Sequence, residues 1–325
     1  MVPPSVISIA IAFAVSALTL RLLLSPRVAA WFLDHPNERS LHASPVPRMG
    51  GLGIMLAVTI GMLLVGGNGL LVALAVGLAL LSLLDDWKGL PSGVRLLGHL
   101  AAAAIFVLAD FSASNWAAML LLVLAVGWMT NLYNFMDGAD GLAGGMAVAG
   151  FGSYAVAAWL AGNTPFALGS LSIAAATAAF LLFNFPPARM FMGDAGSIPL
   201  GFLAATLGLA GYREGFWPLW FPLVAFGPFV ADASVTIVRR ALRGERIWQA
   251  HRSHYYQRLV LMGWTHRRLA LAEYGLMLIS GVAALLALRQ PLSIQLLILM
   301  VLAVVYILIG FAVDRRFGSQ GKGIR

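Results

Sequence analysis

Long runs of apolar residues recur along the whole chain, and this pattern limits what the chain can fold into. A helix that crosses a bilayer needs about 20 mostly apolar residues. We predict eleven such helices, at residues 4–24, 50–66, 68–84, 94–110, 116–133, 141–161, 165–184, 196–211, 217–238, 269–288 and 292–312. Several of the links are very short, which favours antiparallel neighbours. We therefore expect an all-α, polytopic membrane bundle that forms a single domain over residues 1–325.

The composition excludes an ordinary soluble fold. Only 10% of the residues are charged and the mean hydropathy is +0.88, whereas a soluble domain carries about 25% charged residues. Cysteine is absent, which excludes disulfide and thiolate chemistry. A net charge of +8 would suit a nucleic-acid partner, but its distribution fits membrane topology better. We therefore expect membrane lipid, and no nucleic acid, around this protein.

The lysines and arginines indicate how the helices are oriented. If the N-terminus lies outside and the C-terminus inside, all but three of the 21 basic residues lie in inner segments, the exceptions being Arg21, Arg213 and Arg289. Such an excess follows the positive-inside rule. The inner segments are 25–49, 85–93, 134–140, 185–195 and 239–268, together with the C-terminal tail. Because the polar clusters fall in these five segments, we expect them to form an active-site face toward the cytoplasm.

The most informative polar cluster is the run NLYNFMDGADGLAGG at 131–145. It places Asn131, Asn134, Asp137 and Asp140 at the end of an apolar run, where an acid beside lipid is unfavourable by about 2.5–3.5 kcal/mol. Gly138 allows close approach of a ligand to the main chain. A helix end with Asx-type turns would explain one Asp and one Gly, but not this whole set. The cluster indicates a site for a metal ion and a phosphate.

Two further clusters carry carboxylates at helix ends. In the run DDWKG, Asp85 and Asp86 can divide the roles of base and metal ligand, and Lys88 can neutralise phosphate charge. A solvated helix end is the alternative for this pair. In the run FMGDAGS, Asp194 opens a helix whose N-terminus favours phosphate, and a carboxylate there can hold Mg²⁺. Helix capping is the alternative role for Asp194, and it is compatible with metal binding.

Basic and histidine side chains form the remaining candidates. Arg48 lies in a proline-stiffened inner loop, and Arg252 and His254 lie in the last inner loop, for which we favour a functional role. The general basic character of both loops has a simpler explanation in topology and lipid headgroups. Asp232 stands apart inside a predicted span, where an acid is either functional or bonded to a neighbouring helix.

Four segments taken together resemble one enzyme family. They are PRMGG at 47–51, DDWK at 85–88, NLYNFMDGADGL at 131–142 and FMGDAGS at 191–197. In this order they are similar to the polyprenyl-phosphate N-acetylhexosamine-1-phosphate transferases, and the resemblance extends from Asp34 to about Arg258. It implies that a polyprenyl phosphate attacks the β-phosphate of a UDP-N-acetylhexosamine and releases UMP, assisted by Mg²⁺ or by Mn²⁺ in its place. Undecaprenyl phosphate is the lipid we expect in a bacterial inner membrane, and a homodimer is a further expected partner.

The resemblance also implies roles for individual residues. Asp85 and Asp86 match the family's paired acids, which act as base or orienting group, and we count Asp86 with Asp194 as metal ligands. Lys88 matches a lysine on the phosphate side. The positions that match the nucleotide pocket are Asp137, Gly138, Asp140, Asn184 and Phe191. We add Asn131, Asn134, Arg48 and Arg252 as substrate-binding residues, and His254 as a catalytic residue.

The last inner loop departs from the family pattern, because Tyr256 and Gln257 stand where many members carry histidines. This variant resembles the O-antigen-initiating branch, with deoxy sugars such as UDP-QuiNAc or UDP-FucNAc. The main alternative function is a polytopic secondary transporter with an intramembrane acidic site. Transporters place such sites near the bilayer midplane, often in paired repeats, whereas these acids lie at inner helix ends. A glycosyltransferase that works outside the membrane would need acids in the outer loops, which carry few.

Overall fold

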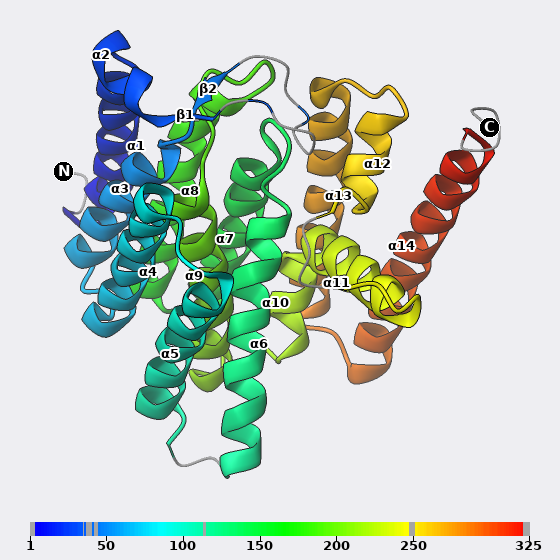
Figure 1. Cartoon of the computed structure of the whole chain (residues 1–325). Helices are drawn as coiled ribbons and strands as arrows, with labels where there is room; N and C mark the ends of the chain where they lie inside the picture. Colours follow the sequence, from blue (N-terminus) through cyan, green and yellow to red (C-terminus); the bar gives the residue numbers. More distant parts are fainter. Residues whose placement is uncertain are drawn as a thin grey trace.

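The protein is a bundle of long helices with one short two-stranded sheet at its upper end (Figure 1). This computed structural model describes residues 4–34, 36, 41, 45–112, 115–246 and 251–320. The first half contains α1 (Pro4–Leu23), α2 (Pro26–Ala29), η1 (Ala30–Phe32), β1 (Leu33–Asp34), β2 (Val46–Pro47), α3 (Gly50–Leu64), α4 (Gly69–Lys88), α5 (Ser92–Asp110) and α6 (Trp116–Phe135). The second half contains α7 (Leu142–Leu160), α8 (Thr164–Asn184), α9 (Asp194–Arg213), α10 (Trp220–Ala225), α11 (Gly227–Leu242), α12 (Tyr255–Leu261), α13 (His266–Ala287) and α14 (Leu292–Gln320).

The all-helical membrane architecture is confirmed, and the exact count of eleven spans is not. Among the described residues, eight helices are long and apolar enough to cross a bilayer: α4, α5, α6, α7, α8, α9, α13 and α14. A ninth is reached if α1 is counted together with the short helices after it, across a bend of 74°. The expected span at 50–66 is the shorter helix α3, with 15 residues. The orientation of the two ends stays a prediction.

The expected span at 217–238 is wrong as a single helix. The structure divides it into α10 and α11, which meet at Phe226. Pro228 explains the break, because proline has no N–H to donate and its ring collides with the carbonyl one turn earlier. Gly227 beside it adds further backbone freedom. In Figure 1, α11 therefore lies across the bundle instead of continuing along it.

Local sequence signals set the ends of several helices. Asn68 caps α4, where its side chain accepts hydrogen bonds from the main-chain N–H groups of Leu70 and Leu71, at 3.0 and 3.2 Å. At the other end, Gly89 adopts a φ of 65°, the left-handed conformation that commonly closes a helix. These boundaries place Asp85 and Asp86 in the last turn of α4.

The helix α9 forms the centre of the bundle, and 83% of its apolar stretch is buried. It meets the start of α3 so closely that a side chain at Gly51 would collide with the main chain of Ala195 and Gly196. Main-chain hydrogen bonds from Gly50 to Phe191 (2.9 Å) and from Gly51 to Met192 (2.8 Å) hold the two segments together. This contact fixes the start of α9, and therefore Asp194, against the loop that carries Arg48.

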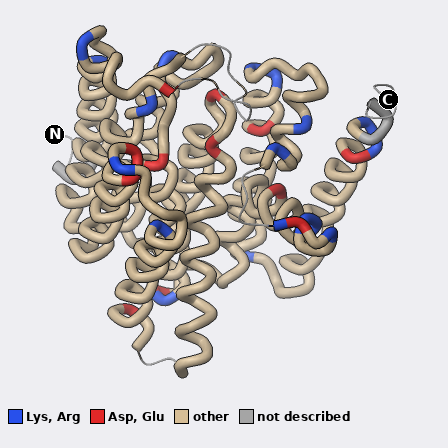
Figure 2. The backbone as a smooth tube through the Cα atoms, viewed as in Figure 1, with Lys and Arg blue, Asp and Glu red and all other residues tan. Residues whose placement is uncertain are grey.

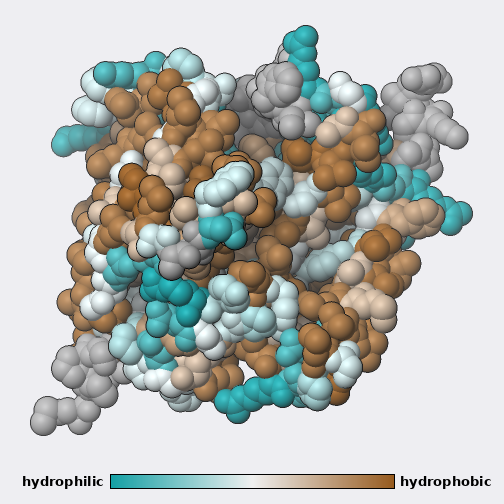
Figure 3. All heavy atoms as spheres, turned by 90° about the horizontal axis from the view of Figure 1, so that it is seen from below, coloured by the Kyte–Doolittle hydropathy of each residue, from teal (hydrophilic) through white to brown (hydrophobic). Residues whose placement is uncertain are grey.

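Charged side chains gather toward one end of the bundle. Figure 2 shows most Asp, Glu, Lys and Arg residues in the upper half, near the sheet, α12 and the end of α4, and few toward the lower end. Figure 3, which views the lower end, shows hydrophobic residues around much of the rim and hydrophilic residues in patches. α14 is the least covered span, with 11% of its apolar stretch buried.

Candidate active site

A cavity of about 330 Å³ opens at the charged end of the bundle, and we call it the main cavity. Its walls come from the loop after η1, the α6–α7 loop, the α8–α9 loop, α12 and the start of α13. The lining residues are Asp34, Leu41, Arg48, Asn134, Asp137, Gly138, Ala139, Asp140, Asn184, Phe191, Gly193, Asp194, Gln257 and His266. Seven of the residues predicted from sequence to bind substrate, and the predicted metal ligand Asp194, are therefore brought together here.

The α6–α7 loop supplies the floor of the main cavity. α6 ends at Phe135, and Gly141 then adopts a φ of 77° at the start of α7, a conformation that glycine accepts without strain. The side chain of Asn184 accepts a hydrogen bond from the Gly141 N–H at 2.8 Å and donates one to the carbonyl of Met190 at 2.8 Å. Asn184 therefore joins this loop to the α8–α9 loop and is held in place from both sides.

Asp140 is fixed by two neighbours from distant parts of the chain. One oxygen accepts a hydrogen bond from the N–H of Ala188 at 3.0 Å, and the other lies 3.0 Å from Nδ1 of His266. Asn134 is fixed in a similar way, because its side-chain oxygen accepts a hydrogen bond from the Ser197 hydroxyl at 2.7 Å. These contacts hold the Asn134 amide and the Asp140 carboxylate in the cavity wall.

The start of α9 brings a carboxylate and basic groups together. Gly193 precedes α9 with a φ of 70°, and a side chain at that position would collide with the side chain of Arg48. Asp194 is the first residue of α9, and its carboxylate lies 3.9 Å from Nη1 of Arg95. Arg48 contacts Asp86. The N-terminus of α9 thus combines a helix dipole that favours anions with a carboxylate that favours cations.

The carboxylate of Asp137 has the environment of a cation ligand. No described residue donates a hydrogen bond to it or forms an ion pair with it. Burial raises the pKa of the Asp137 carboxyl well above its usual range, the negative charge of Asp194 raises it further, and the guanidinium of Arg48 offsets part of the shift. An acid in this position favours either a proton or a bound cation. Asp137 and Asp194 line the same cavity, so a divalent ion held by them would neutralise both charges.

A ready-made metal cage is absent from the described residues, because no three carboxylate or imidazole side chains surround one point. Mg²⁺ does not need such a cage, because it keeps several waters and takes one or two carboxylates together with substrate phosphates. Ions that require a dedicated set of protein ligands fit less well. The main cavity is therefore suited to a metal ion that arrives with, or is completed by, a phosphate-bearing substrate.

The paired acids of α4 lie beside the main cavity and do not line it. Asp85 accepts hydrogen bonds from the N–H of Leu90 at 2.7 Å and from Arg95 at 2.9 Å, so both of its oxygens are occupied. Asp86 is held by Arg48. Lys88 is exposed and lies 5.5 Å from the ring centroid of Trp87. Asp85, in the last turn of α4, is thus bonded to Leu90 and Arg95 after that helix, whereas Asp86 is the acid that connects to the cavity through Arg48.

Three further predicted residues also lie outside the cavity lining. The side chain of Asn131 donates to the Gly127 carbonyl at 2.7 Å, and its oxygen lies 3.3 Å from Nδ1 of His99 on α5. His254 is buried, with 2% of its surface exposed, and Arg252 is exposed. Two residues of the inner segment 239–268 do line the cavity, namely Gln257, three positions after His254, and His266.

Three residues in or beside the cavity were given no site role from the sequence. His266 begins α13 and pairs with Asp140, and Gln257 lies on α12. Arg95 joins Asp85 to Asp194. In the sequence these residues belong to basic inner segments in which topology already explains a positive charge. No pattern along the chain distinguishes Arg95 from the other basic residues, and only the folded contacts do so.

Known proteins give an independent comparison. Residues 69–212 match the sequence profile of glycosyl transferase family 4. The chain is 32% identical, over 94% of its length and 92% of the relative, to a probable undecaprenyl-phosphate N-acetylglucosaminyl 1-phosphate transferase of Bacillus subtilis strain 168. It is 30% identical to a decaprenyl-phosphate N-acetylglucosaminephosphotransferase of Mycobacterium tuberculosis, over 78% of this chain and 74% of the relative.

A third relative is named for a different transferred group. The chain is 28% identical to a phospho-N-acetylmuramoyl-pentapeptide-transferase of Shouchella clausii, over 81% of its length and 90% of that protein. The family profile covers α4 to α9, the part that contains Asp86, Asp137 and Asp194. The chain therefore belongs to glycosyl transferase family 4, within the superfamily of polyprenyl-phosphate hexosamine-1-phosphate transferases.

Proposed function

We propose that this protein transfers an N-acetylhexosamine 1-phosphate from a UDP-sugar to undecaprenyl phosphate and releases UMP. The reaction takes place on the cytoplasmic face of a bacterial inner membrane, as the first membrane step of O-antigen or another cell-envelope polysaccharide. Two of the relatives named above are N-acetylglucosamine-1-phosphate transferases by name, which supports the reaction class. Because these relatives are transferases by name, a transporter is the less favoured function.

One observation carries this proposal. The carboxylates of Asp137 and Asp194 share the main cavity, and no described residue forms an ion pair or hydrogen bond with Asp137. A diphosphate substrate is anionic, so it would be repelled by this wall unless a divalent cation lay between them. We assign Mg²⁺, with Mn²⁺ as a substitute, to Asp194 together with Asp137 or the sequence-predicted partner Asp86. When bound, the ion would supply charge neutralisation for the diphosphate and the leaving UMP.

The remaining cavity residues suit the nucleotide sugar. Asp140 and Asn184 fix the shape of the wall against which the nucleotide would lie, because each is already bonded on both sides, and Phe191 offers an apolar face. Gly138 leaves the main chain of the loop accessible. The guanidinium of Arg48 lies in the same wall and can bind phosphate oxygens with its fork of N–H groups.

The acceptor needs little activation by the protein. In the step, an oxygen of the lipid phosphate forms a bond to the β-phosphorus of the UDP-sugar, and the bond from that phosphorus to the UMP oxygen breaks. A phosphate monoester has a second pKa near 6, so at neutral pH the acceptor is mostly dianionic. Positioning and charge stabilisation then account for most of the rate enhancement. Asp86 and Arg48 are placed to orient the acceptor, whereas Asp85 already accepts two hydrogen bonds.

The experiment is a test of UMP release by the purified protein. The full chain is incubated with Mg²⁺, undecaprenyl phosphate and, one at a time, UDP-GlcNAc, UDP-QuiNAc and UDP-FucNAc. We expect UMP release that requires both the lipid and the metal, and the preferred sugar identifies the donor. Asp194→Asn is expected to abolish the release, and Asp137→Asn and Asp86→Asn are compared by the Mg²⁺ concentration that each requires.

A matched control lies at the other end of the bundle. Asp110 is also an acid at the end of a long helix, and it pairs with Arg213 at 2.9 Å, away from the main cavity. Asp110→Asn is expected to leave UMP release within about twofold of the unmodified protein, because neither Asp110 nor Arg213 lines the main cavity. Absence of UMP with every donor, or full release by Asp194→Asn, would contradict the proposed function.

A further inference from the structure

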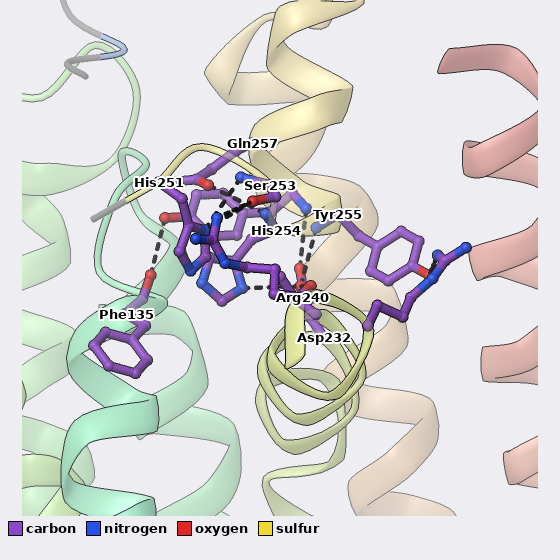
Figure 4. A network of polar contacts seen from close by, with 11 residues as sticks. Phe135, Asp232, Arg240, His251, Ser253, His254, Tyr255 and Gln257 are labelled. Atoms are coloured by element: carbon purple, nitrogen blue, oxygen red, sulfur yellow. Dashed lines mark hydrogen bonds and ion pairs between the residues drawn. The ribbon is translucent and has the colours of Figure 1, made fainter. Parts of the chain in front are cut away.

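The carboxylate of Asp232 collects hydrogen bonds from the start of α12. Its Oδ1 accepts from the N–H of Tyr255 at 2.9 Å, and its Oδ2 accepts from the N–H of Tyr256 at 3.0 Å (Figure 4). These are two of the N–H groups that a helix cannot satisfy within its own first turn. The break at Phe226, which turns α11 across the bundle, is what presents an acid on α11 to the start of α12.

The same carboxylate fixes the ring of His254. Nδ1 of His254 lies 3.2 Å from Oδ1 of Asp232, and the hydroxyl of Thr236 donates to that oxygen at 3.1 Å. An ionised carboxylate is an acceptor, so this contact holds the Nδ1 edge of the imidazole toward Asp232. His254 is 2% exposed and stacks on Tyr256 with ring centroids 5.9 Å apart. The acid therefore fixes the orientation of this histidine.

The segment that Asp232 anchors forms part of the main cavity. The hydroxyl of Tyr256 donates to the carbonyl of Phe135 at 3.1 Å, and a side chain at Gly138 would collide with that hydroxyl. Gln257 lines the cavity, and its side-chain oxygen accepts from the N–H of His254 at 3.2 Å. A small displacement of the start of α12 would move Tyr256 and Gln257 against the loop that holds Asp137.

We propose that Asp232 is a positioning residue for the transfer reaction. It holds the N-terminus of α12 so that Tyr256 and Gln257 support the α6–α7 loop in the geometry that binds the nucleotide sugar. This inference rests on the proposed function for the identity of the reaction, and it assigns Asp232 a role within that site although Asp232 does not line the cavity. Asp232 acts through α12, not on the reacting atoms.

Asp314 provides a matched control, because it joins the same helices without contacting His254. Its carboxylate pairs with Arg239 of α11 at 2.5 Å and with Arg258 of α12 at 2.7 Å, and it also accepts from the Tyr255 hydroxyl at 3.4 Å. It therefore connects α14 to α11 and α12 on the side away from the main cavity. If an acid beside α12 mattered only for stability, the two acids would give the same kinetic result.

The test compares Asp232→Asn with Asp314→Asn in the full chain, in detergent or nanodiscs. Asparagine has nearly the shape of aspartate, but its NH₂ group is a donor. It would face one of the main-chain N–H groups whose hydrogen bonds Asp232 now accepts. We expect Asp232→Asn to speed hydrogen exchange in the segment 253–258 and to raise KM for the UDP-sugar about tenfold. KM for undecaprenyl phosphate is expected to stay within about twofold. Asp314→Asn is expected to lower the melting temperature while leaving both KM values within about twofold.

The outcomes separate the inference from the proposed function. Equal kinetic losses in the two variants, or faster exchange in Asp232→Asn without a change in KM for the UDP-sugar, would overturn the positioning role. If the unmodified protein releases no UMP from any donor, the proposed function fails. The positioning role of Asp232 in the transfer then fails as well, even if Asp232→Asn speeds hydrogen exchange at the start of α12. Should Asp232→Asn not fold, Thr236→Ala removes one donor from the same carboxylate and is expected to raise the same KM about threefold.

Discussion

The carboxylate of Asp140 lies 3.0 Å from Nδ1 of His266, so the α6–α7 loop is joined to the start of α13 by a direct polar contact. The two residues are 126 positions apart in the chain. The N–H of Ala188 donates to the second oxygen of Asp140, which brings the α8–α9 loop into the same arrangement. The Asp140 side chain thus holds three segments together at the main cavity: the α6–α7 loop, the α8–α9 loop and the start of α13.

His266→Ala removes this contact and is expected to weaken binding of the nucleotide sugar. A partly exposed ion pair contributes up to about 1 kcal/mol, so we expect KM for the UDP-sugar to rise roughly threefold to fivefold. His266→Gln keeps a donor near Asp140 and should recover most of the loss. Steady-state UMP release at varied UDP-sugar checks both variants, and an unchanged KM in His266→Ala would contradict the assigned contact.

Gly51→Ala tests the close crossing of α3 and α9. The added Cβ would meet the main chain of Ala195 and Gly196, which cannot move without shifting α9. Overpacking of this kind usually destabilises a protein by about 1–3 kcal/mol. We expect a lower melting temperature. Gly77→Ala is the control, because nothing lies within 4 Å of a Cβ there, and a melting temperature equal to or above that of the unmodified protein is expected.

Arg48→Lys tests whether a guanidinium is required in the cavity wall. Arg48 contacts Asp86 and lines the main cavity, and a lysine cannot reproduce its fork of donors. Loss of one hydrogen bond between charged groups corresponds to about 1.5–3 kcal/mol, so kcat/KM for the UDP-sugar should fall about 10- to 150-fold. Arg189→Lys is the control in a neighbouring loop, where Arg189 donates to the Leu182 carbonyl and does not line the cavity. Equal effects of both changes would argue against a special role for Arg48.

The lowered pKa of His251 predicts how the stability of the last inner loop depends on pH. Burial, together with the nearby His254 and Arg240, lowers the pKa of His251 to about 4, from an ordinary value of 6.5. The folded protein therefore favours the neutral ring, and its stabilising contribution is complete above pH 6.5 and is lost as the pH falls toward 4. His251→Gln should flatten the decline in melting temperature across this range. Parallel curves for both proteins would show that His251 does not cause the decline.

The apolar pattern predicts the long helices well, because a span needs only length and hydropathy. The expected spans at 68–84, 116–133 and 165–184 begin within one residue of α4, α6 and α8, whose ends carry their own sequence signals. Asn68 and Asn163 accept hydrogen bonds as N-caps, and Pro186 follows the end of α8. These are local properties, and they require no knowledge of the neighbouring helices.

The break between α10 and α11 shows that the apolar composition of a segment does not by itself predict one continuous helix. Residues 217–238 are apolar enough for a span, yet Pro228 removes one helix hydrogen bond, and the chain changes direction. Proline inside α9 at Pro199 does not have this effect. Whether a proline bends a helix depends on the tertiary contacts around it, which the sequence pattern does not contain.

The residues of the candidate site also divide into those that a local motif predicts and those that only the fold reveals. Asp137, Asp140 and Asp194 belong to short motifs in which neighbouring glycines accompany the acid, and the structure brings them to one cavity. His266 and Gln257 reach that cavity because α12 and α13 pack against the α6–α7 loop, a relationship between segments more than a hundred residues apart. Such residues can be found only once the fold is known.

The walls of the main cavity include residues as far apart as Asp34 and His266. A chain emerging from the ribosome will have inserted Asp137 and Asp194 long before α12 and α13 exist. Until His266 is synthesised, Asp140 lacks one of its two partners and the cavity lacks the wall that contains Gln257. A chain synthesised only as far as α11 therefore carries its acidic residues without the complete cavity, which requires Gln257 of α12 and His266 of α13.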